Sequence, residues 1–322
     1  MSLTLDPESV EPFVAGLVGA CDVGGGPTSE QLDVLTAITT HVWGRSDLDV
    51  AGVRPLTPDE LAEVVTSPVD RRHFHEMLVT LEACRHPLTD EQLSRVEAYE
   101  AAIGVVGPDA ALFRTMVDEG TERAKADFAR FLSTSTEARV EPSLREVPVV
   151  EGATEPGLVA RLERLRSCAP GTLGHAYLGF YEAAGLPLPG VEATALNHFY
   201  VAHDMTHVIA GIGTTAEAEV ALSAFLMAMV DDAVNRSALL ASLIVHEAGF
   251  GDSNKVRAET GVLARPGAAD LLAAELARGG ACTADFSRID HLALADVPLD
   301  EVRSEFGVLR PVDPDDGHHF LW

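Results

Sequence analysis

Positive charge, aromatic side chains, cysteine and long apolar runs are all scarce in this chain. Its 23 lysines and arginines are outnumbered by 50 aspartates and glutamates, which gives a formal net charge of −27. Such a surface repels phosphate, so nucleic acids and anionic membranes are poor partners. The acidic surface favours solubility, with docking to a basic protein partner as the alternative.

Only four cysteines are spread over the 322 residues, and no Cys-x-x-Cys pair occurs. So few thiols predict small buried side chains in a reducing compartment rather than a disulfide framework. The N-terminal segment lacks the basic and apolar regions of a secretion signal. The longest apolar run, 220–230, is shorter than the ~20 residues that span a bilayer. We therefore expect a cytoplasmic protein without a transmembrane segment, at most peripheral to a membrane through a partner.

Helix signals dominate what is present. The apolar fraction of 47% is enough for hydrophobic cores, and the abundant alanine and leucine favour helices. Thr28, Thr57 and Thr89 are each followed three residues later by Glu or Gln. This spacing is typical of a capping box at a helix start. Since no segment shows sustained strand alternation, we predict an all-α protein made of two helical domains.

The helical pattern breaks between residues 133 and 157, where three prolines and two glycines occur without an apolar stripe. This composition is typical of an interdomain linker. We therefore divide the chain into a helical domain at 1–132, a linker at 133–157, a second helical domain at 158–311 and a tail at 312–322. His318 and His319 fall in this tail, which we expect to be flexible.

The N-terminal domain resembles the TerB-like domains associated with tellurite resistance. The resemblance lies in segments 22–30 and 85–91, each of which is a loop that leads into a capped helix. These loops hold few acidic residues that could bind a metal. We therefore expect this domain to bind a protein partner or to form a homodimer rather than to carry a second active site.

The most informative segment places His203, Asp204 and His207 on one expected helix, with Glu219 after a glycine-containing break. At 100° per residue, His207 lies about 40° and Asp204 about 100° from His203. The break allows the next helix to bring Glu219 to face them. Histidines four residues apart often bind nothing, but several ionisable groups inside an apolar helix favour a compensating ion. We predict one divalent metal at these four residues, with zinc first and iron(II) or manganese as alternatives.

The spacing His203-Asp204-x-x-His207, then eleven residues, then Glu219 resembles the signature of the Coq4 family of ubiquinone-biosynthesis proteins. Segments 170–177 and 299–307 resemble the family in matching order. The resemblance implies an all-helical fold with one metal, usually zinc, at those four positions and a hydrophobic cavity for a prenylated ring. Members are linked to oxidative removal of a carboxyl group from the quinone precursor and to organising the biosynthetic complex.

Three side chains are further candidates for lining that cavity or supporting the ligands. His175 and Tyr177 lie in the segment that resembles the family, and Tyr200 lies near the arc of the predicted ligands. His246-Glu247 lacks a second histidine four residues on, so it is not half of a metalloprotease His-Glu-x-x-His motif.

We therefore predict a metal-dependent enzyme that acts on a hydrophobic aromatic, quinone-like, polyketide or isoprenoid substrate, by oxidative decarboxylation, hydroxylation or lyase chemistry. One alternative is a non-catalytic adaptor that holds a prenyl lipid beside a structural metal. Another is an HD-type phosphohydrolase, which would use His175, His203, Asp204 and either Asp231 or Asp232. A third is a metalloprotease-like helix in which Asp204 replaces the usual glutamate base.

Overall fold

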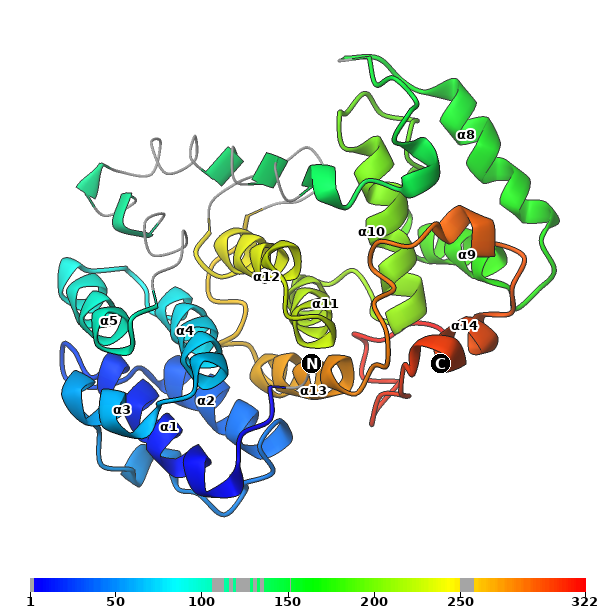
Figure 1. The fold of residues 1–322 in the computed structure, drawn as a ribbon. Coiled ribbons are helices and arrows are strands. Elements are labelled where there is room, and N and C mark those ends of the chain that lie inside the picture. The colour runs from blue at the N-terminus through cyan, green and yellow to red at the C-terminus, as the bar shows by residue number, and fades with distance from the viewer. Residues whose placement is uncertain are drawn as a thin grey trace.

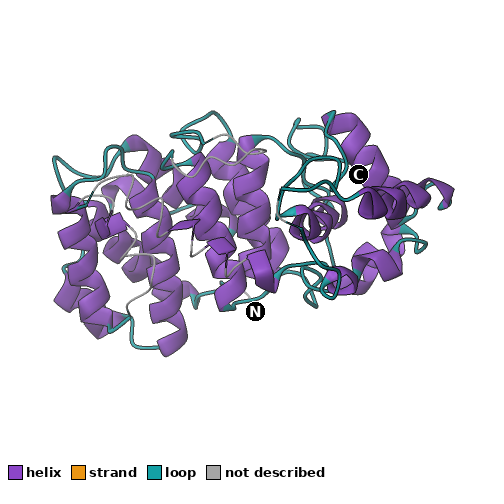
Figure 2. Ribbon diagram, turned by 90° about the horizontal axis from the view of Figure 1, so that it is seen from above, coloured by secondary structure: helices purple, strands orange, loops and turns teal. Residues whose placement is uncertain are grey.

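The computed structural model describes residues 3–105, 113–115, 118–119, 128–129, 132–133, 136–150, 152–249 and 258–322. Over these residues the regular elements are helices, and β contacts are limited to isolated bridges such as the one between Ile212 and His319. Figure 2 shows these helices and their connecting loops along an elongated molecule. The predicted all-α class is confirmed. In the same residues, no helix combines the length and apolarity needed to cross a bilayer.

The helices of the first third precede residue 105. They are α1 (Pro7–Cys21), α2 (Ser29–His41), η1 (Val50–Gly52), α3 (Pro58–Val64), α4 (Pro68–Ala83) and α5 (Asp90–Ile103). The later helices are η2 (Pro142–Leu144), α8 (Pro156–Glu163), η3 (Arg164–Ser167), α9 (Leu173–Ala184), α10 (Asn197–Ala210), α11 (Ala216–Met229), α12 (Ala233–His246), α13 (Ala268–Gly280), η4 (His291–Leu294) and α14 (Leu299–Phe306).

The expected helix starts are confirmed by their caps. Thr28 and Thr57 each accept a hydrogen bond from the amide three residues on, and the side chain at that position accepts one from the cap amide. Thr89 accepts the equivalent bond from the amide of Gln92. These reciprocal bonds satisfy amides that have no partner inside the helix, so they set where α2, α3 and α5 begin.

Two hydrophobic cores share the helix α11. Val220 and Ala224 belong to a core that also contains residues of α1 to α5, α12 and α13. Leu222 and Phe225 belong to a second core formed with α9, α10 and α14. In Figure 1, α11, α12 and α13 lie between α1–α5 on one side and α8, α9, α10 and α14 on the other. The two cores therefore do not divide at the expected linker, and the two-domain organisation stays a prediction.

The last residues, expected to form a flexible tail, pack against the second core. Phe320 donates its amide to the carbonyl of Gly211, and the His318 carbonyl accepts from the amide of Gly213. The side chain of His319 is 4% exposed and lies 3.2 Å from a carboxylate oxygen of Glu275. These contacts tie the tail to the turn between α10 and α11, so the expectation of a flexible tail was wrong.

Candidate metal centre

The turn between α10 and α11 determines how the two helices face each other. α10 ends at Gly211, whose φ of 70° lies in the left-handed region that glycine adopts without strain. A Cβ at this position would lie 1.6 Å from the indole nitrogen of Trp322, so only glycine fits beneath that ring. Thr215 then caps α11 by accepting a hydrogen bond from the amide of Ala218. This turn places Glu219, in the first turn of α11, beside α10.

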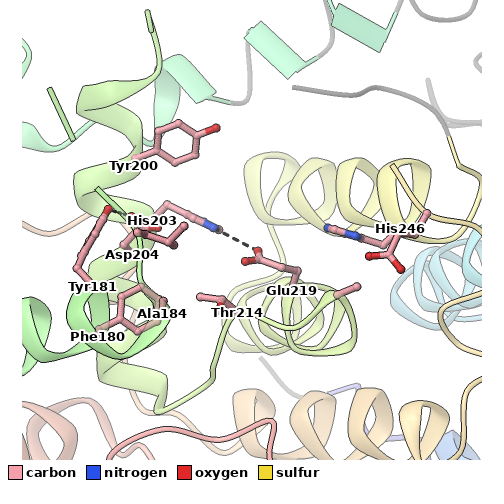
Figure 3. A pocket seen from close by; sticks show the side chains of 12 residues that line it. Phe180, Tyr181, Ala184, Tyr200, His203, Asp204, Thr214, Glu219 and His246 are labelled. Carbon is pink, nitrogen blue, oxygen red and sulfur yellow. Dashed lines mark hydrogen bonds and ion pairs between the residues drawn. The ribbon is translucent and has the colours of Figure 1, made fainter. Parts of the chain in front are cut away.

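The four residues expected to bind a metal are brought together here. His203 Nε2 and His207 Nε2 are 3.2 Å apart. The carboxylate oxygens of Glu219 lie 3.5 Å from His203 Nε2 and 3.4 Å from His207 Nε2. One donor atom each from Asp204, His203 and His207 lie within 4.8 Å of one another. Figure 3 shows His203 on α10 and Glu219 on α11 pointing toward one another.

Neighbouring groups orient both imidazoles. His207 Nδ1 lies 3.1 Å from the carbonyl oxygen of Ile212, which can only accept, so Nδ1 carries the proton. Nε2 of the neutral ring then keeps its lone pair for a metal, as is usual for metal-binding histidines. His203 stacks on Phe199 with ring centroids 5.2 Å apart. Its Nδ1 is buried and has no hydrogen-bond partner among the described residues.

Asp204 is held by a hydroxyl group from a different helix. Tyr181, on α9, donates a short hydrogen bond to Asp204 Oδ2. The ring of Tyr177 packs against that of Tyr181, with centroids 5.1 Å apart. Burial, followed by the charge of Asp204, raises the pKa of both tyrosines well above the usual range. Tyr181 therefore keeps its proton and orients one oxygen of the Asp204 carboxylate.

Charge couples the imidazoles to the carboxylates. Burial acts to lower the pKa of His207, but the adjacent Glu219 carboxylate outweighs it and raises that pKa. Burial acts to raise the pKa of Glu219, but His207 and His203 hold it well below the usual range. The pKa of Asp204 is raised because burial outweighs the attraction of both imidazoles. The site therefore favours positive charge between the carboxylates, which is the electrostatic condition for holding a cation.

The centre opens into a pocket of ≈ 240 Å³. Its lining consists of Phe180, Tyr181, Ala184, Leu186, Tyr200, His203, Asp204, Thr214, Ala216, Glu219, His246 and Glu259. The pocket therefore has three of the candidate ligands, His203, Asp204 and Glu219, at one place and aromatic and aliphatic side chains around them (Figure 3). This mixture is typical of sites for small molecules, where apolar walls exclude water and a few polar groups orient the ligand.

Of the candidates for lining the cavity, Tyr200 does line it, whereas His175 is exposed and does not. Tyr177 is fully buried, does not line the pocket and packs against Tyr181, which does. His246 was missed because its motif suggested only an incomplete metalloprotease helix, although it ends α12 at the pocket. Tyr181 was not predicted either. It lies one helical turn after the candidate Tyr177, and residues four apart share a helix face, so this spacing could have identified it.

An HD-type phosphohydrolase would need His175 and Asp231 or Asp232 in addition to His203 and Asp204, and none of these additional residues lines the pocket. Asp231 pairs with Arg236 and does not line the pocket. Asp232 caps α12 by accepting from the Asn235 amide and also pairs with Arg288. Both aspartates are thus explained by helix capping and ion pairing, and the structure offers no support for that alternative.

The donor atoms fit a divalent ion. Zinc bonds of about 2.0–2.1 Å place neighbouring ligand atoms of a tetrahedral site ~3.3 Å apart. The two imidazole nitrogens are 3.2 Å apart, and the two oxygens of the Glu219 carboxylate lie 3.5 Å from His203 Nε2 and 3.4 Å from His207 Nε2, respectively. Two imidazoles and a carboxylate are also the ligand types that catalytic zinc sites use. The residues therefore fit the metal that the sequence led us to expect.

Comparison with known proteins adds little to this description. No family model matches the chain, and no curated protein matches it. One similar solved structure is that of a candidate ubiquinone biosynthesis protein from Nostoc punctiforme, at 2.85 Å resolution. It is 17% identical, covers 76% of this chain and 100% of its own, and superposes with a TM-score of 0.33. The resemblances to the Coq4 and TerB-like families stay predictions.

Proposed function

We propose that this chain is a metalloenzyme that binds one divalent ion, with zinc as the best match, at His203, His207 and Glu219, with Asp204 as a fourth ligand. The single observation that carries the proposal is that two imidazole nitrogens lie 3.2 Å apart, while one Glu219 oxygen lies 3.5 Å from His203 Nε2 and the other lies 3.4 Å from His207 Nε2. Without an ion, only a proton on one of the imidazoles could balance the Glu219 carboxylate, and a divalent ion would take the place of that proton.

The expected substrate is a hydrophobic, ring-bearing molecule with a carboxyl or carbonyl group. The pocket wall provides Phe180 and Tyr200 for contact with a ring and Leu186 and Ala184 for an aliphatic part. A polar head would then point at the candidate ligands. This substrate class agrees with what the resemblance to the Coq4 family implies, and it includes aromatic, quinone-like, polyketide and isoprenoid compounds.

The chain's own residues divide the chemical tasks. A divalent ion, when bound, supplies Lewis acidity toward a carboxylate or carbonyl oxygen. Tyr181 keeps the Asp204 carboxylate in place, and the Ile212 carbonyl keeps the His207 tautomer. His246 lines the opposite side of the pocket, and burial lowers its pKa. A neutral imidazole in that position can take a proton from the substrate, and the apolar wall keeps bulk water away.

Metal analysis of purified protein tests the proposal. Wild type is expected to hold one equivalent at this centre, and His207→Ala and Glu219→Ala are expected to lose it. His175→Ala is the matched control, because this exposed histidine lies on the neighbouring helix α9 and outside the pocket. Full metal occupancy in both ligand variants would contradict the proposal.

The substrate class is tested on the same preparations by mass spectrometry of small molecules released from the protein. A ring-bearing hydrophobic compound that is retained by wild type and His175→Ala supports the assignment. Turnover that depends on His246 separates an enzyme from an adaptor, because an adaptor would retain the compound without changing it.

A further inference from the structure

A second cluster of metal-binding side chain types lies outside the pocket, where the N-terminal helices meet α12. Glu30 is in the first turn of α2, His86 follows the end of α4, and Glu247 caps the end of α12. One donor atom from each residue lies within 4.8 Å of the other two. The cluster therefore joins three segments, of which those of Glu30 and Glu247 are more than 200 residues apart in the chain.

Glu247 is the buried centre of this cluster. Its side chain is 0% exposed, and one carboxylate oxygen lies 2.6 Å from His86 Nε2. The other oxygen accepts a hydrogen bond from the amide of Leu263 at 2.8 Å. A carboxylate without exposure to water is retained only where hydrogen bonds and positive charge compensate for its lost hydration. The amide of Leu263 and the imidazole of His86 therefore orient the Glu247 carboxylate.

Glu30 adds a second carboxylate where a cation is needed. Its Oε1 is buried and meets no donor within the described part of the chain. Burial, followed by the charge of Glu247 and a hydrogen bond between the two carboxyl groups, raises the pKa of Glu30 to about 8, although a hydrogen bond from the amide of Ala264 acts to lower it. The charged neighbours that shift this group are thus negative. A proton or a cation must accompany the pair of carboxylates when both face the same small volume.

We propose that Glu30, His86 and Glu247 form a second binding site, for a divalent transition-metal ion of the zinc or cobalt type. Two carboxylates balance the two positive charges, and a ring nitrogen favours such ions over calcium and magnesium, which prefer oxygen ligands. The His86 side chain is 26% exposed, so an ion can enter from solvent and water can complete its coordination.

The site would connect the N-terminal helices to the wall of the pocket. Glu247 directly follows His246, which lines the pocket beside the first centre. An ion held by Glu30 and His86 on one side and by Glu247 on the other would therefore fix the last turn of α12. This gives the N-terminal helices a structural role at the pocket and does not depend on which reaction the first centre performs.

Cobalt(II) binding to the metal-free full-length chain tests the inference, with stoichiometry from elemental analysis and ligand type from the visible absorption spectrum. Glu30→Gln and His86→Gln are each expected to bind one equivalent fewer than wild type at pH 7.5. Both side chains are partly exposed, so these changes leave the core intact. Asp33→Asn is the matched control, because it removes an exposed acid of the same helix that is outside the cluster.

The outcomes separate metal ligation from a shared proton and from a general effect of charge. Unchanged stoichiometry in Glu30→Gln and His86→Gln would overturn the inference and leave a proton shared by two carboxylates. An equal loss in Asp33→Asn would overturn it as well, since net charge alone would then account for the binding. His207→Ala removes only the first centre. If one metal equivalent is retained in His207→Ala and is lost when Glu30→Gln is added to it, the second site is supported even if the proposed function fails.

Discussion

Glu219→Gln is the sharpest perturbation of the candidate metal centre. The carboxylate lies 3.5 and 3.4 Å from the two imidazole nitrogens and belongs to a different helix. Glutamine has nearly the same shape but carries no charge, so the change removes a ligand without leaving a cavity. We expect the fold to survive and zinc affinity to fall.

The size of the effect follows from ligand chemistry. Loss of a group that only orients a ligand costs 10–100-fold in metal affinity, so loss of the ligand itself should cost at least about 100-fold. Zinc at about 1,000 times the wild-type dissociation constant stabilises the folded state by about 4.1 kcal/mol. A 100-fold weaker site gains only about 1.4 kcal/mol under the same conditions. At about 2 °C per kcal/mol, the zinc-induced rise in Tm should fall from about 8 °C to about 3 °C.

The assay is thermal unfolding of metal-free protein with and without zinc, in a Glu30→Gln background so that the second cluster does not contribute. Each variant is compared with its own metal-free form, because Glu219→Gln also removes an ion pair with His207. Glu217→Gln is the control, since Glu217 lies in the same helical turn and pairs with Arg265 instead. An identical zinc-induced shift in Glu219→Gln and wild type would refute the assignment.

Three further outcomes follow from the same structure. Tyr181→Phe removes the hydrogen bond to Asp204 and should weaken zinc binding 10–100-fold in a competition titration, without loss of helical content; unchanged affinity would rule out Asp204 as a ligand that needs this support. Gly279→Ala places a Cβ 2.0 Å from a main-chain oxygen of α11 and should cost about 3 kcal/mol in urea unfolding. Gly179→Ala, with no atom within 4 Å of its Cβ, should instead raise stability by ~0.5–1 kcal/mol. Burial raises the pKa of Glu76 from 4.5 to about 7. As the pH rises through this range, Glu76 ionises in the unfolded chain before it does in the folded one, so the free energy of unfolding should fall by about 3 kcal/mol at most. Glu76→Gln should remove this slope, and an unchanged pH profile would show that other groups cause it.

The candidate ligands could be identified from sequence because their arrangement is largely local. His203, Asp204 and His207 share an arc through helix geometry alone, and Gly211 marks the end of that helix. The distance from Glu219 to the imidazoles was only an expectation, since it depends on the turn beneath Trp322. That turn depends on contacts with the C-terminal residues, which no local pattern reveals.

The pocket wall and the second cluster could not be predicted in the same way. His246 and Glu247 were judged as one motif. In the structure, His246 lines the pocket, whereas Glu247 belongs to the cluster with Glu30 and His86. Glu30, in the first turn of α2, and His86 belong to the two segments whose own acids looked too few to bind a metal. The third residue of the cluster, Glu247, directly follows α12, and only packing brings it to Glu30 and His86.

Helix type, helix starts and the spacing of the candidate ligands were determined by the sequence alone, because capping bonds and the helical period act over three or four residues. The sharing of α11 by two cores, the docking of the C-terminal residues and the meeting of Glu30 with Glu247 were decided by the tertiary structure. These contacts join residues far apart in the chain. They form only where burial of many apolar side chains compensates for the entropy of bringing the segments together.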